Sequence, residues 1–154
     1  TQVIQTPFSG ITAAETALLT DIRDHEVAHR EFFRTALGES GIGFLDINLS
    51  SINFSDRTSV LTAARTFEDL GVAAYNGAGR LITTPEYLTL AGKIVSVEAR
   101  HAAYIRNLLS PGSFADGTVV EPATGLEISK DPATVLAAAQ PFFRTRIVAD
   151  NLPK

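Results

Sequence analysis

The feature that most constrains this chain is residues 11–37, which contain neither proline nor glycine and repeat their candidate core positions at steps of three and four. These steps place the side chains on one face of an α-helix. Thr12 and Glu15 have the spacing of a capping box, and Gly38 directly follows the last periodic position. The sequence therefore predicts a long amphipathic helix with both ends marked.

Further stretches show the same period. Residues 57–81 and 84–109 are each predicted to form a long helix, and residues 131–139 a short one that begins at an Asp-Pro pair. Residues 38–56, with three glycines, Asn48, Asn53 and Asp56, and residues 110–130, rich in glycine, proline, serine and threonine, are predicted to be loops. The predicted fold is all-α: an up-down bundle with three long helices in this chain and a short C-terminal helix.

Length and composition exclude several classes of protein. The 154 residues suit one domain over 1–154, with a helical core at 11–109 and a loop-rich segment at 110–154. A net charge of -4 without a basic cluster argues against nucleic acid as a partner. No apolar run approaches the roughly 20 residues that a membrane span needs. Since cysteine is absent, any metal site must be built from His, Asp and Glu.

Two of the three histidines follow a glutamate by three residues, in Glu26-Val27-Ala28-His29 and Glu98-Ala99-Arg100-His101. In a helix each pair shares a face. All four side chains fall in mid-helix where the periodicity calls for an apolar residue, and Glu68 takes the same kind of position on the second predicted helix. We therefore expect one polar cluster inside the bundle.

Burying three carboxylates together is unfavourable unless a positive charge compensates them. Two divalent ions would do so, because carboxylates and neutral imidazoles are ligands that iron, manganese or zinc accept. The i,i+3 spacing is the arrangement of ferritin-like di-iron and di-manganese bundles. The alternative is that these histidines are buried and satisfied by glutamates of their own helices.

Other polar residues near these positions are weaker candidates. His25 points about 100° around the helix from Glu26, which favours a supporting or surface role over direct ligation. Tyr75 and Tyr104 lie within two turns of the candidate ligands and could serve in redox chemistry or hydrogen bonding, or be core tyrosines with satisfied hydroxyls. Arg106 is expected to be solvated or to lie beside the ligands.

Three segments carry a resemblance to a known family. "DHEVAHREFF", "FEDLGVAAYNGAG" and "IVSVEARHAAYIRNLL" make residues 11–109 resemble the ferritin-like domain of desiccation-related proteins. The resemblance implies an up-down bundle with two bound ions, iron or manganese, and export to the periplasm, the cell surface or the extracellular space. The positions that match its di-metal ligands are Glu26, His29, Glu68, Glu98 and His101.

The sequence departs from that pattern at its start. Ferritin-like bundles have a preceding helix that carries another Glu ligand, and Glu15 cannot replace it, because eleven residues place it roughly 16 Å along the helix from Glu26. We expect the bundle to be completed by an upstream helix, by another copy of the chain, or by the segment around Phe142 and Phe143. The absence of an initiator methionine favours the upstream helix.

Two functions follow from these observations. The leading one is a ferritin-like protein with a dinuclear iron or manganese site that reacts with oxygen or peroxide in stress protection. The other is a non-catalytic structural or interaction protein of the envelope or extracellular space, which retains the bundle with an empty or single-metal site.

Overall fold

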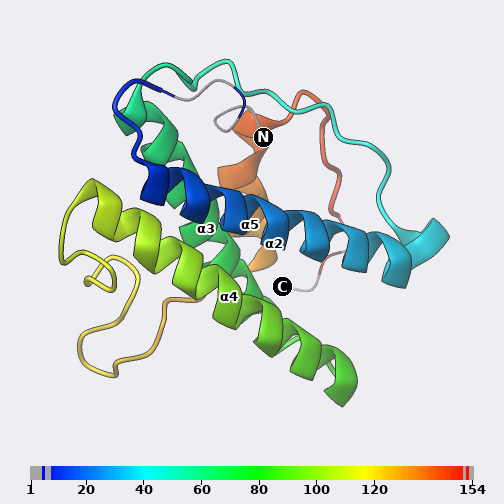
Figure 1. Ribbon diagram of the computed structural model, residues 1–154. Coiled ribbons are helices and arrows are strands. Elements are labelled where there is room, and N and C mark those ends of the chain that lie inside the picture. Colours follow the sequence, from blue (N-terminus) through cyan, green and yellow to red (C-terminus); the bar gives the residue numbers. More distant parts are fainter. Residues whose placement is uncertain (1–4, 6–7, 151, 153–154) are drawn as a thin grey trace.

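The structure, a computed structural model, describes residue 5, residues 8–150 and residue 152. Within this part of the chain the regular elements are helical, which confirms the all-α prediction (Figure 1). None of these helices combines the length and the apolarity that a membrane span requires. The α-helices are α2 (Ala13–Leu37), α3 (Arg57–Gly79), α4 (Pro85–Leu109) and α5 (Pro132–Ala139).

The helices begin and end at the residues that the sequence marks. The capping box of α2 is formed: the Thr12 hydroxyl accepts from the backbone N–H of Glu15, whose carboxylate accepts from the N–H of Thr12 at 3.0 Å. Asp56 caps α3 and Asp131 caps α5 through their side chains. Gly38 ends α2 with a φ of +50°, a conformation that favours glycine.

Two predicted ends differ by two residues from the observed ones. The first long helix begins at Ala13 because Thr12 is the N-cap and lies outside it. The second ends at Gly79 because Leu81 N donates to Ala78 O at 2.8 Å, which closes a tighter turn than an α-helix allows.

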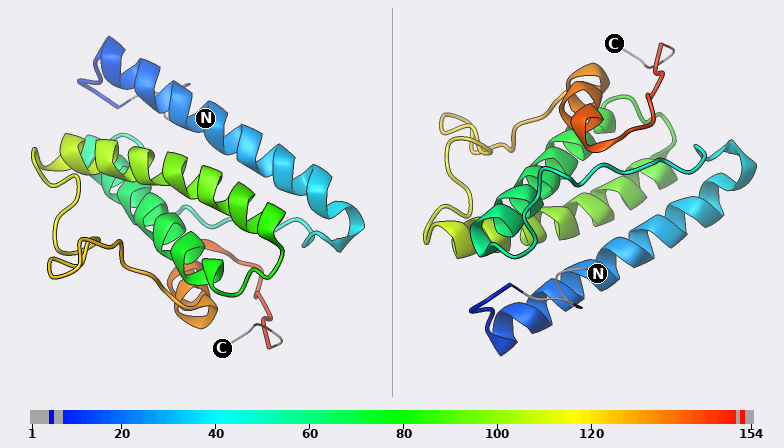
Figure 2. Two further views of the ribbon diagram at one scale, coloured as in Figure 1. Left: turned by 90° about the horizontal axis from the view of Figure 1, so that it is seen from below. Right: turned by 90° about the horizontal axis from the view of Figure 1, so that it is seen from above.

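The core lies between α3 and α4, which make the most extensive helix–helix contact. Leu61 of α3 and Ile105 of α4 are fully buried there. Helix α2 lies on one side of the α3–α4 pair and α5 on the other (Figure 2). The remaining buried apolar side chains of this pair are Val60, Val72, Ala73, Ile94 and Ala102.

Helix α2 is attached mainly through polar contacts. Of its side chains only Glu15 is buried. Arg57 of α3 donates to this carboxylate from Nε at 3.1 Å and from Nη2, and it also lies 3.4 Å from the carbonyl oxygen of Leu108 at the end of α4. One guanidinium therefore links the three long helices. Several large apolar side chains of α2 remain more than one-third exposed, namely Leu18, Val27, Phe32, Phe33 and Leu37.

The C-terminal segment, residues 140–145, packs on α3 and on the loop between α2 and α3. The ring of Phe142 lies edge-on to Phe67 with centroids 4.5 Å apart. Asn48 N donates to Phe142 O, and Arg144 N donates to Asp46 O, each at 2.7 Å. This segment and α5 therefore both pack on α3.

The backbone at Lys130 crosses α3 at a glycine. Lys130 N donates to Ala73 O at 3.0 Å, and a Cβ on Gly77 would lie 1.8 Å from Lys130 O. A side chain at position 77 would therefore displace the backbone segment at Lys130. Gly71, in the same helix, has no heavy atom within 4 Å of such a Cβ.

We expect Gly77→Ala to lower the free energy of unfolding by about 2 kcal/mol, the usual cost of forcing an atom into packed space. Gly71→Ala is the matched control and should raise it by about 0.5 kcal/mol, because alanine favours the helix. Urea denaturation followed by circular dichroism measures both. Equal effects of the two substitutions would contradict the close approach.

The Glu15–Arg57 pair makes the stability of the protein depend on pH. The hydrogen bond from Arg57, with that from the Thr12 backbone, holds the pKa of Glu15 below its ordinary value of 4.5. The stabilisation is therefore present above that value and is lost as the pH falls through the lowered pKa. Glu15→Gln should cost about 1 kcal/mol at pH 7 and progressively less under acid. A Glu39→Gln control, at an exposed carboxylate, should show no such difference between pH 7 and pH 3.

Candidate metal centre

The three long helices bring the candidate ligands together at the middle of the bundle. Helix α2 provides Glu26 and His29, α3 provides Glu68, and α4 provides Glu98 and His101. One ligand atom from each of four residues lies within 4.8 Å of the others, and these residues are Glu26, Glu68, Glu98 and His101. The five residues are called the Glu–His cluster below.

Two imidazoles share the carboxylates of the cluster. Nδ1 of His101 lies 3.3 Å from Oε1 of Glu26, 3.5 Å from Oε2 of Glu68 and 3.7 Å from Oε2 of Glu98. Nδ1 of His29 lies 3.0 Å from Oε1 of Glu98 and 3.7 Å from Oε1 of Glu26. Glu26 and Glu98 each contact both imidazoles. A carboxylate shared by two metal positions would be placed in this way.

Three atoms of the cluster are buried without a hydrogen-bond partner in the described part of the chain: Nδ1 of His29, Oε2 of Glu68 and Nδ1 of His101. Their neighbours are close, but the bond directions do not meet hydrogen-bond geometry. Buried polar atoms are nearly always paired in proteins. The unpaired atoms of His101 and Glu68 lie 3.5 Å apart, which fits a cation held between them, and Nδ1 of His29 lies 3.0 Å from Glu98 on the same cluster.

The charges of the cluster are balanced by histidine when no metal is bound. Burial raises the pKa of Glu68 to about 7. Burial works against a charged His101, but its contacts with Glu26, Glu68 and Glu98 outweigh this and raise its pKa to about 11. Burial likewise opposes ionised Glu98, yet His101 and His29 bring its pKa below the ordinary value. The carboxylates thus require a positive charge at the position of the His101 imidazole.

The two sides of the cluster differ in exposure. Glu68, Glu98 and His101 are buried, whereas the side chain of Glu26 is 45% exposed and that of His29 is 18% exposed. The expectation that Glu26 occupies a core position is therefore wrong. The reason is that, in the part of the chain that the structure describes, no helix covers the outer side of α2.

His25 contacts a candidate ligand directly. Its Nδ1 lies 3.0 Å from Nε2 of His101, and the two ring planes are 6° apart with centroids 5.2 Å apart. His25 itself is exposed. The sequence predicted a supporting role or a surface role for His25. The structure agrees with both positions, because His25 lies beside the candidate ligand His101 and is exposed.

The two candidate tyrosines lie in different places. Burial, followed by the charges of Glu98 and Glu26, raises the pKa of Tyr75 to about 12, so this side chain is close to the cluster. Burial also raises the pKa of Tyr104, but the carboxylate that acts on it is Glu15. Tyr75 is the better placed of the two to act at a bound metal.

An apolar pocket of about 660 Å³ lies one helical turn from the cluster. Phe33 of α2 lines it four residues after His29, and Ile94 of α4 lines it four residues before Glu98. Tyr75 of α3 lines it as well. Among the residues that the structure describes, no charged side chain lines this pocket. It gives the Glu–His cluster an apolar neighbour on the side of the α2 C-terminus.

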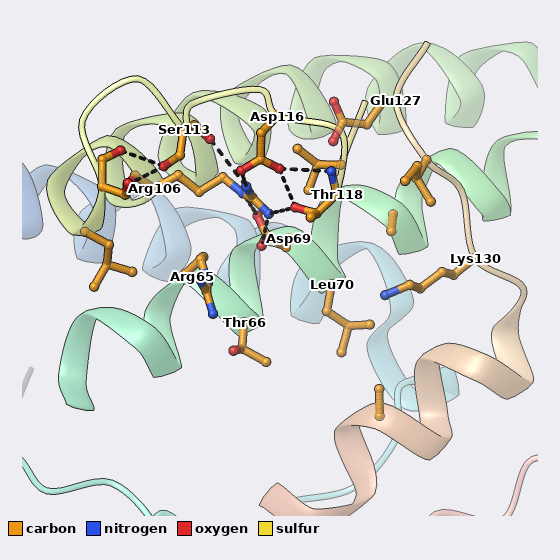
Figure 3. A pocket seen from close by; sticks show the side chains of 16 residues that line it. Arg65, Thr66, Asp69, Leu70, Arg106, Ser113, Asp116, Thr118, Glu127 and Lys130 are labelled. Atoms are coloured by element: carbon orange, nitrogen blue, oxygen red, sulfur yellow. Dashed lines mark hydrogen bonds and ion pairs between the residues drawn. The ribbon is translucent and has the colours of Figure 1, made fainter. Parts of the chain in front are cut away.

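A polar pocket of about 520 Å³ lies elsewhere, between α3, α4 and the loop 110–130 (Figure 3). Arg106 is buried there and donates to Asp69 from Nε at 2.8 Å and from Nη2 at 3.0 Å. Nη1 lies 3.1 Å from Asp116, and Nη2 donates to Thr118 at 2.8 Å. None of the predicted ligands lines this pocket.

The expectation that Arg106 is solvated or lies beside the ligands is therefore wrong. Loop 110–130 folds back over α4 and supplies Asp116 and Thr118, which the helical periodicity could not reveal. His25 is the other residue whose importance the sequence understated, and its signal was only its position next to Glu26.

The family of the chain was tested by comparison with known proteins. Residues 2–111 match the model of the family described as "Ferritin-like domain". This range contains α2, α3, α4 and all five residues of the Glu–His cluster. No curated protein and no solved structure matches the chain.

The charge balance predicts opposite effects of two substitutions in metal-free protein. His101→Ala should lower the free energy of unfolding at pH 7 by about 3 kcal/mol, because it leaves buried carboxylates without their cation. Glu68→Ala should leave it unchanged or raise it, because it removes a buried carboxylate. Urea denaturation in the presence of a chelator measures both, and circular dichroism should show most of the helicity retained. Equal destabilisation would contradict the compensating role of His101.

Proposed function

Since the chain belongs to the ferritin-like domain family, we propose that it holds a dinuclear iron or manganese site that reacts with oxygen or peroxide. The observation that carries this proposal is the set of three buried, unpaired ligand atoms on His29, Glu68 and His101. The proposed ligands are the five residues of the Glu–His cluster. Zinc also accepts such ligands but would not support redox chemistry.

The geometry supports two unequal metal positions. The first would use Glu68, Glu98 and His101 with an oxygen of Glu26, since these four ligand atoms are already close together. The second would use His29 together with Glu26 and Glu98. His29 is the only ligand that belongs to the second position alone, so we expect this position to bind metal more weakly.

When bound, iron or manganese would supply electrons to oxygen or peroxide. The side chains of the cluster would offset the charge of the ions, and the half-exposed Glu26 has the freedom to change its contacts as that charge changes. The apolar pocket beside Tyr75 would admit a small uncharged reactant such as oxygen. Tyr75, whose pKa is raised to about 12, would keep its proton at neutral pH.

A single-metal, non-catalytic protein is the second candidate. The observation that favours it is that His29 is not among the four residues whose ligand atoms lie within 4.8 Å of one another. A lone ion would then tie α2 to α3 and α4 and act on stability alone. Metal stoichiometry distinguishes the two candidates.

We also propose that a further helix completes the bundle, contributed by an upstream segment or by a second copy of the chain. The exposed apolar side chains of α2, which include Val27, Phe32 and Leu37, support this proposal. Light scattering coupled to size exclusion would detect the second copy. Comparison with the encoding gene would detect the upstream segment.

Membership in the desiccation-related group, export from the cytoplasm and a role in stress protection are proposals that the three resembling segments support. Cell fractionation and survival of a deletion strain after drying or peroxide treatment would test them. Full survival of that strain, with the protein found in the cytoplasm, would contradict them.

Metal analysis tests the dinuclear proposal. Protein purified without chelator and titrated anaerobically with Fe²⁺ or Mn²⁺ should bind about two equivalents, one more tightly than the other. His101→Ala and Glu68→Ala should abolish the tight position, and His29→Ala the weak one, since each removes a ligand. Glu31→Ala, at an exposed carboxylate on α2, is the control and should bind as the wild type does.

The outcomes separate the candidates. One equivalent in the wild type that is unchanged in His29→Ala would favour the single-metal protein, and no binding at all would exclude both. The redox proposal is tested by adding oxygen or peroxide to Fe²⁺-loaded protein and following oxidation by near-ultraviolet absorbance. Oxidation no faster than that of free Fe²⁺ would reject that part of the proposal.

A further inference from the structure

His25 and His101 form a contact between two imidazole rings on different helices. Nδ1 of His25, on α2, lies 3.0 Å from Nε2 of His101, on α4, and the rings are nearly parallel. The opposite nitrogen of His101, Nδ1, faces the carboxylates of Glu26, Glu68 and Glu98. His101 therefore has a separate partner at each nitrogen.

The partner at Nδ1 decides where the proton of His101 must lie. A neutral imidazole carries one N–H, and a nitrogen that binds a metal uses its lone pair. If Nδ1 binds the ion, Nε2 must hold the proton and must donate it. The acceptor within reach is Nδ1 of His25, which then has its own proton on Nε2, on an exposed side chain.

We propose that His25 is a positioning residue that accepts a hydrogen bond from Nε2–H of His101 and thereby holds Nδ1 of His101 toward the metal. Imidazole ligands generally donate their other N–H to a neighbouring acceptor, which fixes the ring and its tautomer. Here the acceptor is a histidine from another helix. This inference rests on the proposed function, because it gives His25 a role toward the same site.

Two other roles would fit a nearby imidazole. His25 could bind an ion directly, or it could only stack on His101 and add apolar contact. Its ring nitrogen faces Nε2 of His101, whereas the carboxylates face Nδ1, so the geometry favours the hydrogen bond. Variants at position 25 separate the three roles, and because His25 is exposed they should not disturb folding.

The affinity test uses Zn²⁺ and Mn²⁺ as probes, by titration calorimetry. His25→Ala and His25→Phe should each weaken the tight position about 10- to 100-fold without changing the stoichiometry. His25→Gln should recover most of this loss, because its amide oxygen can accept from Nε2–H. Asp21→Ala, one helical turn away on the same exposed helix, is the control and should bind as the wild type does.

The second readout is the tautomer of His101, measured by long-range ¹H–¹⁵N spectra of the imidazole rings in Zn²⁺-loaded protein. The chain has only three histidines, so assignment by substitution is direct. The wild type and His25→Gln should show a protected proton on Nε2 of His101. His25→Ala and His25→Phe should lose that signal to solvent exchange.

The inference is overturned if His25→Phe binds as tightly as the wild type, which would leave only stacking. It is also overturned if His25→Ala loses a whole equivalent of metal, which would make His25 a ligand, or if His25→Gln behaves as His25→Ala does. If the wild type binds no metal, the proposed function fails by itself. The protected Nε2 proton is then sought in metal-free protein, where its absence overturns the inference and its dependence on position 25 supports the hydrogen bond.

Discussion

The burial of Glu68 and Glu98 against each other's helices is the constraint on which the rest of the structure depends. Two carboxylates at the α3–α4 interface would repel each other and lose hydration unless a cation lay between them. In the metal-free protein the imidazolium of His101 fills this role, with a pKa raised to about 11. The apolar core of Leu61 and Ile105 can therefore form around a polar centre.

The same centre also holds α2 in place. This helix buries little apolar surface, and its polar contacts include Glu15 with Arg57 at one end and the Glu–His cluster and His25 in the middle. Metal binding and the attachment of α2 are therefore linked, because an ion shared by Glu26 and Glu98 would bridge α2 and α4. The large apolar side chains of α2 beyond His29 remain more than one-third exposed.

The fold was largely predictable because its signals are local. Helical periodicity and the caps at Thr12, Asp56 and Asp131 set most helix ends to within two residues. The cluster was predictable as a set, because i,i+3 pairs must share a face. What could not be predicted depends on tertiary context: the exposure of Glu26 follows from what covers α2, and the burial of Arg106 from a loop without periodicity.

The contacts around the cluster give the bundle two unlike ends. At the end where α4 terminates, Arg57 and Arg106 tie the helices together, and Asp69, the partner of Arg106, directly follows Glu68 on α3. This ion pair thus joins α3 to α4 at the residue next to Glu68. The opposite end, in the described part of the chain, surrounds a mainly apolar pocket that reaches Tyr75. Ion pairs and their hydration disfavour an uncharged molecule, whereas apolar walls do not. Under the proposed function, a reactant such as oxygen would therefore enter at the Tyr75 end rather than at the Arg106 end.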